Sequence, residues 1–160
     1  MTDQESSAHG DRARELLAVS GNCAQSSFAA LAEHLDIDAA DTLKALTPFP
    51  GIALRGETCG AVVGSVMAIG ILLGRERLDD YPGMRPSLAA ARRFCRSFEN
   101  QFGGTACDEV LQQGLGGGFD LASADGTASY LAAGGHEHCS NVVAQSVQTA
   151  AEMIANAGRP

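Results

Sequence analysis

The stretch RGETCGAVVGSVMAIGILLG, residues 55–74, predicts the central element of the fold, because it carries no charge after Glu57. Small residues recur four positions apart at Gly60, Gly64 and Ala68, which on a helix leaves one face that another backbone can approach closely. The opposite face carries the residues expected in the core: Val62, Val66, Ile69 and Leu73. The apolar part is about 15–17 residues long, whereas a bilayer span needs about 20. The sequence therefore predicts a buried central helix.

The start of this helix bears on the chemistry of Cys59. Thr58 is the expected N-cap, and Glu57 lies beside it at the positive end of the helix dipole. Cys59 then falls in the first helical turn, where the field lowers the pKa of a thiol and favours the thiolate. This position makes Cys59 the candidate nucleophile of the chain.

The composition favours one acidic domain. The chain has 160 residues, with 19 Asp and Glu against 11 Lys and Arg and a formal net charge of −8. Such a charge argues against nucleic acid or an anionic membrane as a partner. Residues 1–9 predict a disordered polar tail, and residues 10–160 predict a single helical redox domain. The N-terminus lacks the apolar segment of a secretion signal, so the expected location is the cytoplasm.

Helical periodicity predicts an all-α fold. Apolar residues spaced by three and four, with Gly- and Pro-containing connections between them, indicate a compact bundle of roughly six to eight helices around the central helix. Asn22 is the expected cap of a helix that starts at Cys23, and Gly103 is expected to end a later one. Residues 47–56 hold two prolines and two glycines and predict a loop. The closing helix is expected to start near His138.

Five cysteines are present without any CxxC pair, which argues against a thioredoxin-type motif or a zinc-ribbon knuckle. Four of them are expected in the first turns of helices, and we term them the cysteine quartet: Cys23, Cys59, Cys107 and Cys139. Helix starts offer free backbone N–H groups and a positive dipole, which stabilise thiolates and the sulfurs of a metal cluster. Cys95 lies mid-helix on an apolar stripe and is expected to be inert core.

The motifs around the quartet resemble a known family. GNCAQ (21–25), RGETCGAVVG (55–64), FGGTAC (102–107) and a last cysteine that opens the terminal helix are similar to the C_GCAxxG_C_C proteins, small helical proteins to which redox activity is ascribed. The resemblance covers about residues 12–157 and implies that the quartet are the family cysteines, with Cys95 as an extra. The same module resembles part of a two-haem cytochrome subunit that also carries an iron–sulfur centre. This chain has no C-x-x-C-H, so no haem attachment is implied.

Three uses of the quartet are open at this point. The first is an iron–sulfur cluster, [2Fe–2S] or [4Fe–4S], bound by all four thiolates in an electron-transfer protein that works with a redox partner protein. The second is a metal-free thiol–disulfide oxidoreductase with Cys59 as the attacking thiolate. The third is a zinc-stapled or metal-free interaction module, with a homodimer through the Gly60 and Gly64 groove as one form of it.

Two histidines lie beside the last cysteine. His136 and His138 flank Cys139 in sequence, and either could supply a ligand or accept a proton. The simpler interpretation is an exposed loop that precedes the closing helix.

Overall fold

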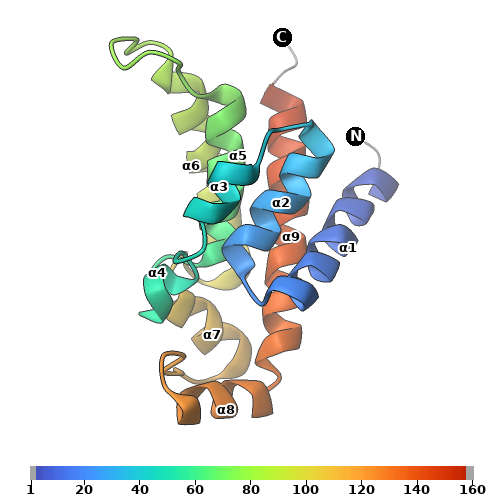
Figure 1. Ribbon diagram of the computed structural model, residues 1–160, viewed down its shortest axis with the longest axis vertical. Coiled ribbons are helices and arrows are strands. Elements are labelled where there is room, and N and C mark those ends of the chain that lie inside the picture. Colours follow the sequence, from blue (N-terminus) through green and yellow to red (C-terminus); the bar gives the residue numbers. More distant parts are fainter. Residues whose placement is uncertain (1–2, 158–160) are drawn as a thin grey trace.

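Helices make up the regular structure of the computed structural model, which describes residues 3–157 (Figure 1). Within that range there are nine helices and no strand: α1 Asp3–Ser20, α2 Cys23–Leu35, α3 Ala40–Ala45, α4 Gly51–Leu54, α5 Gly60–Leu73, α6 Met84–Phe102, α7 Cys107–Leu115, α8 Ala124–Ala132 and α9 Gly135–Ala157. The predicted all-α bundle is confirmed. The count exceeds the expected six to eight because the predicted loop of residues 47–56 contains the short turn α4.

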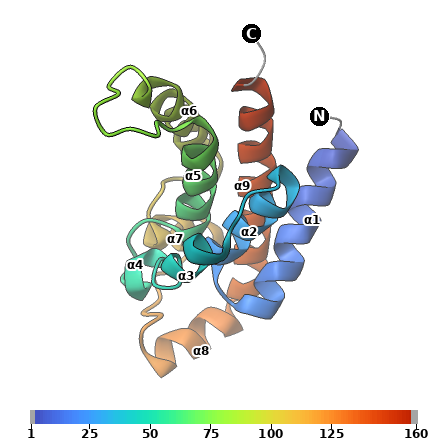
Figure 2. The same cartoon turned by 45° about the horizontal axis from the view of Figure 1, so that its top comes forward.

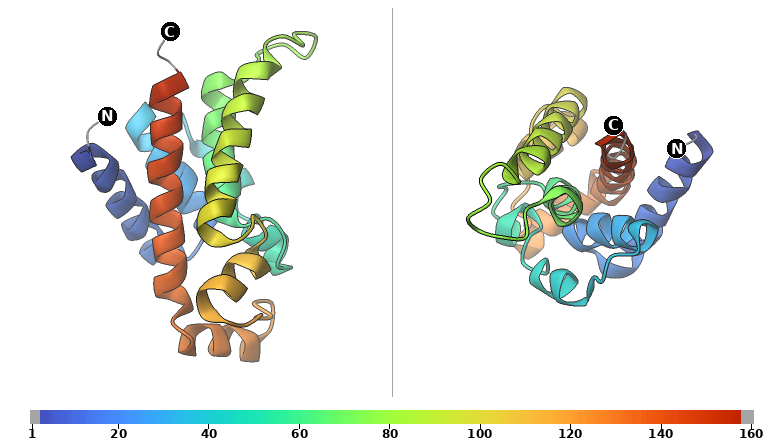
Figure 3. Two further views of the ribbon diagram at one scale, coloured as in Figure 1. Left: turned by 180° about the vertical axis from the view of Figure 1, so that it is seen from behind. Right: turned by 90° about the horizontal axis from the view of Figure 1, so that it is seen from above.

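Five of the helices form the bundle, and the smaller ones gather at one end and along one side. The long helix α9 contacts α1, α2, α5 and α6, and α2 packs against both α1 and α5. Figures 2 and 3 show α9 between the α1–α2 pair and the α5–α6 pair, with α7 and α8 at the lower end of the bundle. Among the described residues, no helix has both the length and the hydrophobicity needed to cross a membrane.

The contact between α2 and α5 is made by backbone rather than by interlocking side chains. A Cβ atom at Gly64 would lie 2.3 Å from the carbonyl oxygen of Ala24 and 2.9 Å from the backbone nitrogen of Phe28. The predicted face of small residues is therefore confirmed, and its partner is α2 of the same chain. Because α2 fills the groove of Gly60 and Gly64, this face is not open to a second copy, and a homodimer stays a prediction.

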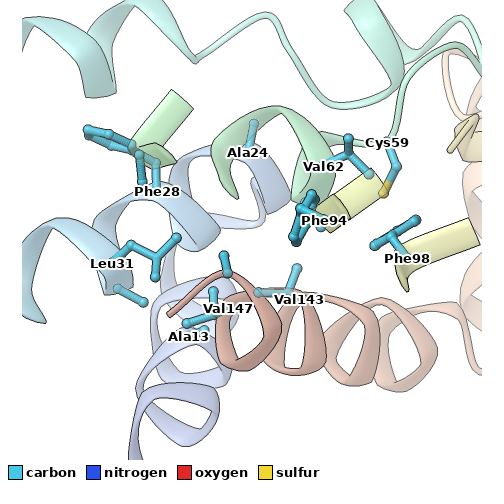
Figure 4. Close-up of a cluster of buried hydrophobic side chains, with 14 of the residues drawn as sticks. Ala13, Ala24, Phe28, Leu31, Cys59, Val62, Phe94, Phe98, Val143 and Val147 are labelled. Atoms are coloured by element: carbon cyan, nitrogen blue, oxygen red, sulfur yellow. The ribbon is translucent and has the colours of Figure 1, made fainter. Parts of the chain in front are cut away.

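The core lies where α2, α5, α6 and α9 meet. Phe28, Phe94 and Phe98 are its largest buried side chains, and Val143 and Val147 face them from α9 (Figure 4). Of the four residues expected on the core face of the central helix, Val62 and Ile69 are buried, and Val66 and Leu73 are half-buried.

The first helix is longer than its apolar pattern predicts. Residues 3–9, expected in the polar tail, belong to α1, while residues 1–2 of that tail lie outside the described range. A Cβ at Gly10 would overlap the side-chain amide of Gln148, so α1 lies directly on α9. Packing against α9 holds the polar first turns in the helix. The single domain of residues 10–160 stays a prediction, and its last three residues lie outside the described part of the chain.

Two predicted helix boundaries are confirmed by their caps. The Asn22 Oδ1 atom accepts hydrogen bonds from the backbone N–H groups of Ala24 and Gln25, at 3.1 and 3.0 Å, and α2 begins at Cys23. At the other boundary, Gly103 ends α6 with a φ of 83°. Both caps are local, so their sequence signals are sufficient to place them.

The replacement of Gly64 by Ala tests the close contact of α2 with α5. The added methyl group meets the α2 backbone, which cannot move aside cheaply, so G64A is expected to lower the free energy of unfolding by about 1–3 kcal/mol. Gly70 lies on the same helix with open space around it, and G70A is expected to raise that free energy by about 0.5–1 kcal/mol. Urea denaturation of the two variants measures both changes. Equal effects of the two substitutions would contradict the backbone contact.

Candidate functional site

The four quartet cysteines come from four different helices. Cys23 is the first residue of α2, and Cys107 is the first residue of α7. Cys59 is the N-cap of α5, which corrects the prediction that Thr58 takes that place. Cys139 is the fifth residue of α9, because that helix starts at Gly135 rather than near His138. Three of the four therefore lie at helix starts, and Cys139 lies one turn in.

A short backbone bridge joins the Cys59 and Cys107 segments. The Cys59 N–H donates to the carbonyl oxygen of Thr105 at 2.8 Å, and the Cys107 N–H donates to the carbonyl oxygen of Glu57 at 2.6 Å. Between them, residues 58 and 106 form an isolated antiparallel bridge. The start of α5 is thus tied to the start of α7, although the two cysteines are far apart in sequence.

The close approach of α2 and α5 brings Cys23 to the same place. A Cβ at Gly60 would lie only 2.4 Å from the Cys23 Sγ atom, so a larger residue there would displace the sulfur. The backbone N–H of Gly60, the residue after Cys59, hydrogen-bonds to Cys23. Gly60 therefore gives the Cys23 sulfur both its space and a donor.

Cys139 is held against Tyr130, a residue that the sequence analysis did not single out. The Tyr130 hydroxyl hydrogen-bonds to Cys139 across the α8–α9 turn. The ring is confined, because it packs where a Cβ at Gly135 would lie and makes an edge-on contact with Phe119 at a centroid distance of 6.0 Å. The adjacent glycines at 134 and 135 are the only local sequence signal that α8 and α9 turn sharply enough for this contact.

Three quartet cysteines open onto one cavity of about 300 Å³. This volume is at the lower end of the range for small-molecule and cofactor sites. Its wall is mainly apolar and comes from the loops and helices at the lower end of the bundle: Leu17, Gly21, Cys23, Pro50, Gly51, Leu54, Gly56, Cys107, Asp108, Phe119, Leu121, Thr127, Tyr130, His136 and Cys139. Cys59 is behind this wall and only 6 % exposed.

One side of the cavity is a left-handed turn. In α4, Ile52, Ala53 and Leu54 have φ values of 47°, 58° and 61°, in a region that residues with a side chain rarely adopt. Gly51 precedes them with a φ of 52°, and a Cβ there would lie 3.3 Å from that of Cys107. Such strain persists only where surrounding contacts impose it, and here those contacts form the wall beside the Cys107 sulfur.

Burial keeps the quartet thiols protonated. Desolvation raises the pKa of Cys23 and of Cys107 to about 12, and it raises the pKa of Cys59 and of Cys139 as well. For Cys59, the N–H groups of α5 act in the opposite direction, but burial outweighs them. The prediction that the helix start lowers the pKa of Cys59 is therefore wrong.

The quartet is mutually coupled, and Cys95 is not part of it. Charge on Cys139 raises the pKa of Cys23, Cys59 and Cys107, and charge on Cys23 raises that of Cys59. All five thiols are free. The pKa of Cys95 responds to its own burial and to Glu99 rather than to the quartet. Its side chain, expected in the core, is half-buried on α6 and packs against the core cluster.

The quartet does not form a ready-made site for one metal ion. Among residues 3–157, no group of three or more His, Cys, Asp or Glu side chains is arranged so that it could hold an ion. Cys23, Cys107 and Cys139 line the cavity, and Cys59 does not. His136 lines the cavity with an exposed side chain, whereas the His138 ring lies 3.2 Å from the carbonyl oxygen of Val110 and faces α7.

Comparison with known proteins places the chain in a family. The profile described as "Putative redox-active protein (C_GCAxxG_C_C)" matches residues 21–153, and the chain belongs to this family. An uncharacterized protein of Archaeoglobus fulgidus is 35 % identical over 107 residues, which cover 62 % of this chain and 71 % of that protein. No solved structure matches the chain significantly. The resemblance seen in the motifs is thus confirmed, and the matched region contains the whole quartet.

Removal of the Tyr130 hydroxyl tests its bond to Cys139. Since this bond lowers the pKa of Cys139, Y130F is expected to raise that pKa and to slow alkylation of Cys139 at pH 8 by about tenfold. Tyr81 is the other tyrosine of the chain and is exposed, so Y81F serves as the matched control. Peptide mass mapping after timed iodoacetamide treatment follows Cys139 alone. Equal rates in the two variants would exclude the hydrogen bond.

Proposed function

We propose that this protein is an electron carrier that binds an iron–sulfur cluster through the cysteine quartet. One observation supports this proposal above the others: three cysteines separated by up to 116 positions (139 − 23) line one apolar cavity, and the buried Cys59 is electrostatically coupled to two of them, Cys23 and Cys139. A fold stabilised by its helix core does not need this convergence. Four thiol donors in an apolar surround are the donor set of an iron–sulfur cluster.

A cluster fits these residues better than a single zinc ion. A tetrahedral zinc site requires all four sulfurs within about 2.3 Å of one point, and the described side chains offer no such point. In a cluster, the cysteines bind different iron atoms and therefore stand further apart. Gly60 leaves space beside the Cys23 sulfur, because a Cβ there would lie only 2.4 Å from it.

The chain's own groups would set the properties of such a centre. The backbone N–H groups of Gly60 and Ala61 lie beside the Cys23 and Cys59 thiols, respectively, and the Tyr130 hydroxyl lies beside Cys139. When bound, the cluster supplies one-electron redox chemistry. N–H and O–H donors to sulfur favour the more negative, reduced state and so raise the reduction potential. Binding also requires the quartet to lose its protons, which makes assembly more favourable at higher pH.

Anaerobic reconstitution with iron and sulfide tests the proposal. We expect broad visible absorption, stoichiometric iron and acid-labile sulfide, and a large loss of all three in any single Cys→Ser variant of the quartet. The C95S variant is the matched control and should keep the cluster, because Cys95 lies apart on α6. A wild-type protein that takes up no iron and sulfide would overturn the proposal. Equal losses in C95S and the quartet variants would show that the bound iron is unspecific.

A metal-free dithiol function is the second candidate, and the pairing of Cys23 with Cys59 favours it. The Gly60 N–H that hydrogen-bonds to Cys23 belongs to the residue after Cys59, so the two thiols are close. Cys59 is buried, so in this alternative Cys23 would meet a substrate disulfide from the cavity, and Cys59 would complete the exchange. Two thiols would become one disulfide, and the substrate would take up the two electrons and two protons. The raised pKa values make both thiols slow nucleophiles at neutral pH.

Mass spectrometry after mild oxidation separates this candidate from the first. A Cys23–Cys59 disulfide would lower the mass of the metal-free protein by two hydrogens and would join two tryptic peptides. C23S and C59S should both abolish this loss, and C95S should not. We expect the metal-free protein to stay reduced under air-free conditions with a glutathione buffer, and stoichiometric disulfide formation there would favour the dithiol function.

The cellular setting follows the sequence-based expectations. We place the protein in the cytoplasm with a redox partner protein, and without nucleic acid or membrane as a partner. A reducing compartment suits five free thiols. Cell fractionation with an antibody against the chain measures its location directly.

A further inference from the structure

Helix α6 is the basic element of an acidic protein. It carries four of the eleven Lys and Arg residues of the chain, Arg85, Arg92, Arg93 and Arg96, and Glu99 is its only acidic residue. Its charge is thus 4 − 1 = +3, within a chain of net charge −8. No other helix of residues 3–157 carries as many Lys and Arg residues.

Three of these arginines form one exposed stripe. Arg85, Arg92 and Arg96 are spaced by seven and four residues, which places them on one side of the helix, opposite the buried Phe94 and Phe98. All three side chains are exposed. The ion pairs found within residues 3–157 use other arginines, and Glu99, seven residues after Arg92, is the one acidic residue of α6 on the same side as the stripe.

An apolar groove of about 470 Å³ lies along α5, and Cys95 is the one residue of α6 that lines it. Its lining is almost entirely apolar: Thr58, Val62, Val63, Val66, Met67, Gly70, Ile71 and Cys95. Ile71 and Leu88 leave 44 % and 57 % of their surfaces exposed at this face. A half-apolar, half-charged surface of this kind is typical of a transient protein interface. Figure 3 shows α6 at the outer edge of the bundle, where a partner can reach it.

The same surface lies close to the quartet. Cys59 belongs to the same buried core cluster as Phe94 and Phe98 on the inner side of α6 (Figure 4). Thr58, the residue before Cys59, lines the groove itself. The arginine stripe is therefore separated from the Cys59 side of the site by about one helix diameter, 10–12 Å. The cavity of the other three cysteines opens elsewhere, at the lower end of the bundle.

We infer that the outer face of α6 and its groove with α5 form the docking surface for an acidic one-electron carrier protein. This inference rests on the proposed electron-transfer function. The charge of the whole chain repels an acidic partner, and the arginine stripe attracts it in one orientation, with the shortest path to Cys59. Three aligned arginines are few for a nucleic acid or a membrane on a chain of charge −8. An apolar groove also matches a protein surface better than a phosphate backbone.

A paramagnetic anion locates the attracting surface without any cluster. Tris(oxalato)chromate(III) is an inert trianion that broadens the NMR signals of amides near which it accumulates. We expect broadening in metal-free protein to be strongest along the outer face of α6. It should disappear in R92E/R96E and persist in K44E, a single charge reversal at an exposed position of α3. Broadening elsewhere, or none, overturns the docking surface. A second copy seated on the groove would hide these amides and sediment as a dimer, and would also overturn it.

The salt dependence of oxidation tests the electron path in the cluster-loaded protein. One electron passes from the reduced protein to hexacyanoferrate(III), which becomes hexacyanoferrate(II). If the anion docks on α6, the rate of oxidation by hexacyanoferrate(III) should fall as ionic strength rises. The net charge of −8 alone would repel the anion, so the rate would then rise with ionic strength. At low salt R92E/R96E should lower this rate by about tenfold or more, and K44E should not. The cation hexaammineruthenium(III) should show no such loss in R92E/R96E.

The two measurements separate the two proposals. Broadening on α6 in a protein that takes up no iron overturns the cluster, and with it the electron carrier as the partner. A cluster that forms normally, but whose oxidation by hexacyanoferrate(III) accelerates with salt, overturns only the docking surface.

Discussion

The close contact of α2 with α5 is the constraint on which the site depends. Gly60 and Gly64 bring the two backbones together, so that the start of α2 lies beside the start of α5. That approach places Cys23 next to Cys59, and the backbone bridge between residues 58 and 106 adds Cys107. Because the glycines serve the packing of the core and the placement of the sulfurs together, stability and function are coupled at this contact.

Burial and hydrogen bonding act on the quartet in opposite directions. Removal from water favours the neutral thiols, while nearby N–H and O–H donors favour the thiolates. In the metal-free chain burial prevails, so the thiols are protonated and slow to react. A bound metal centre would reverse this balance, because it replaces the protons and uses the donors that are already in place. The arrangement therefore suits a bound centre better than a free nucleophile.

Helix caps and the small-residue face of α5 could be predicted from the sequence, because residues close together in the chain determine them. Asn22 caps α2 as expected, and the four-residue spacing of small residues identified the α2-facing side of α5. The quartet was recognised from motifs, and the cavity brings Cys23, Cys107 and Cys139 to one place. The left-handed turn at Ile52 escaped prediction, because the residues of that turn after Gly51 have no intrinsic preference for positive φ and adopt it under tertiary contacts.

Features set by tertiary contacts were missed for the same reason. Tyr130 reaches Cys139 only through the sharp turn between α8 and α9, and that turn also starts α9 early enough to move Cys139 out of its first turn. The sign of the thiol pKa shifts depends on burial, which a helix-start pattern does not report.

Iron K-edge X-ray absorption of the reconstituted C95S protein tests most directly whether the quartet binds an iron–sulfur cluster. We expect iron surrounded by sulfur with a neighbouring iron atom. Iron bound by oxygen or nitrogen, without an iron neighbour, would contradict it.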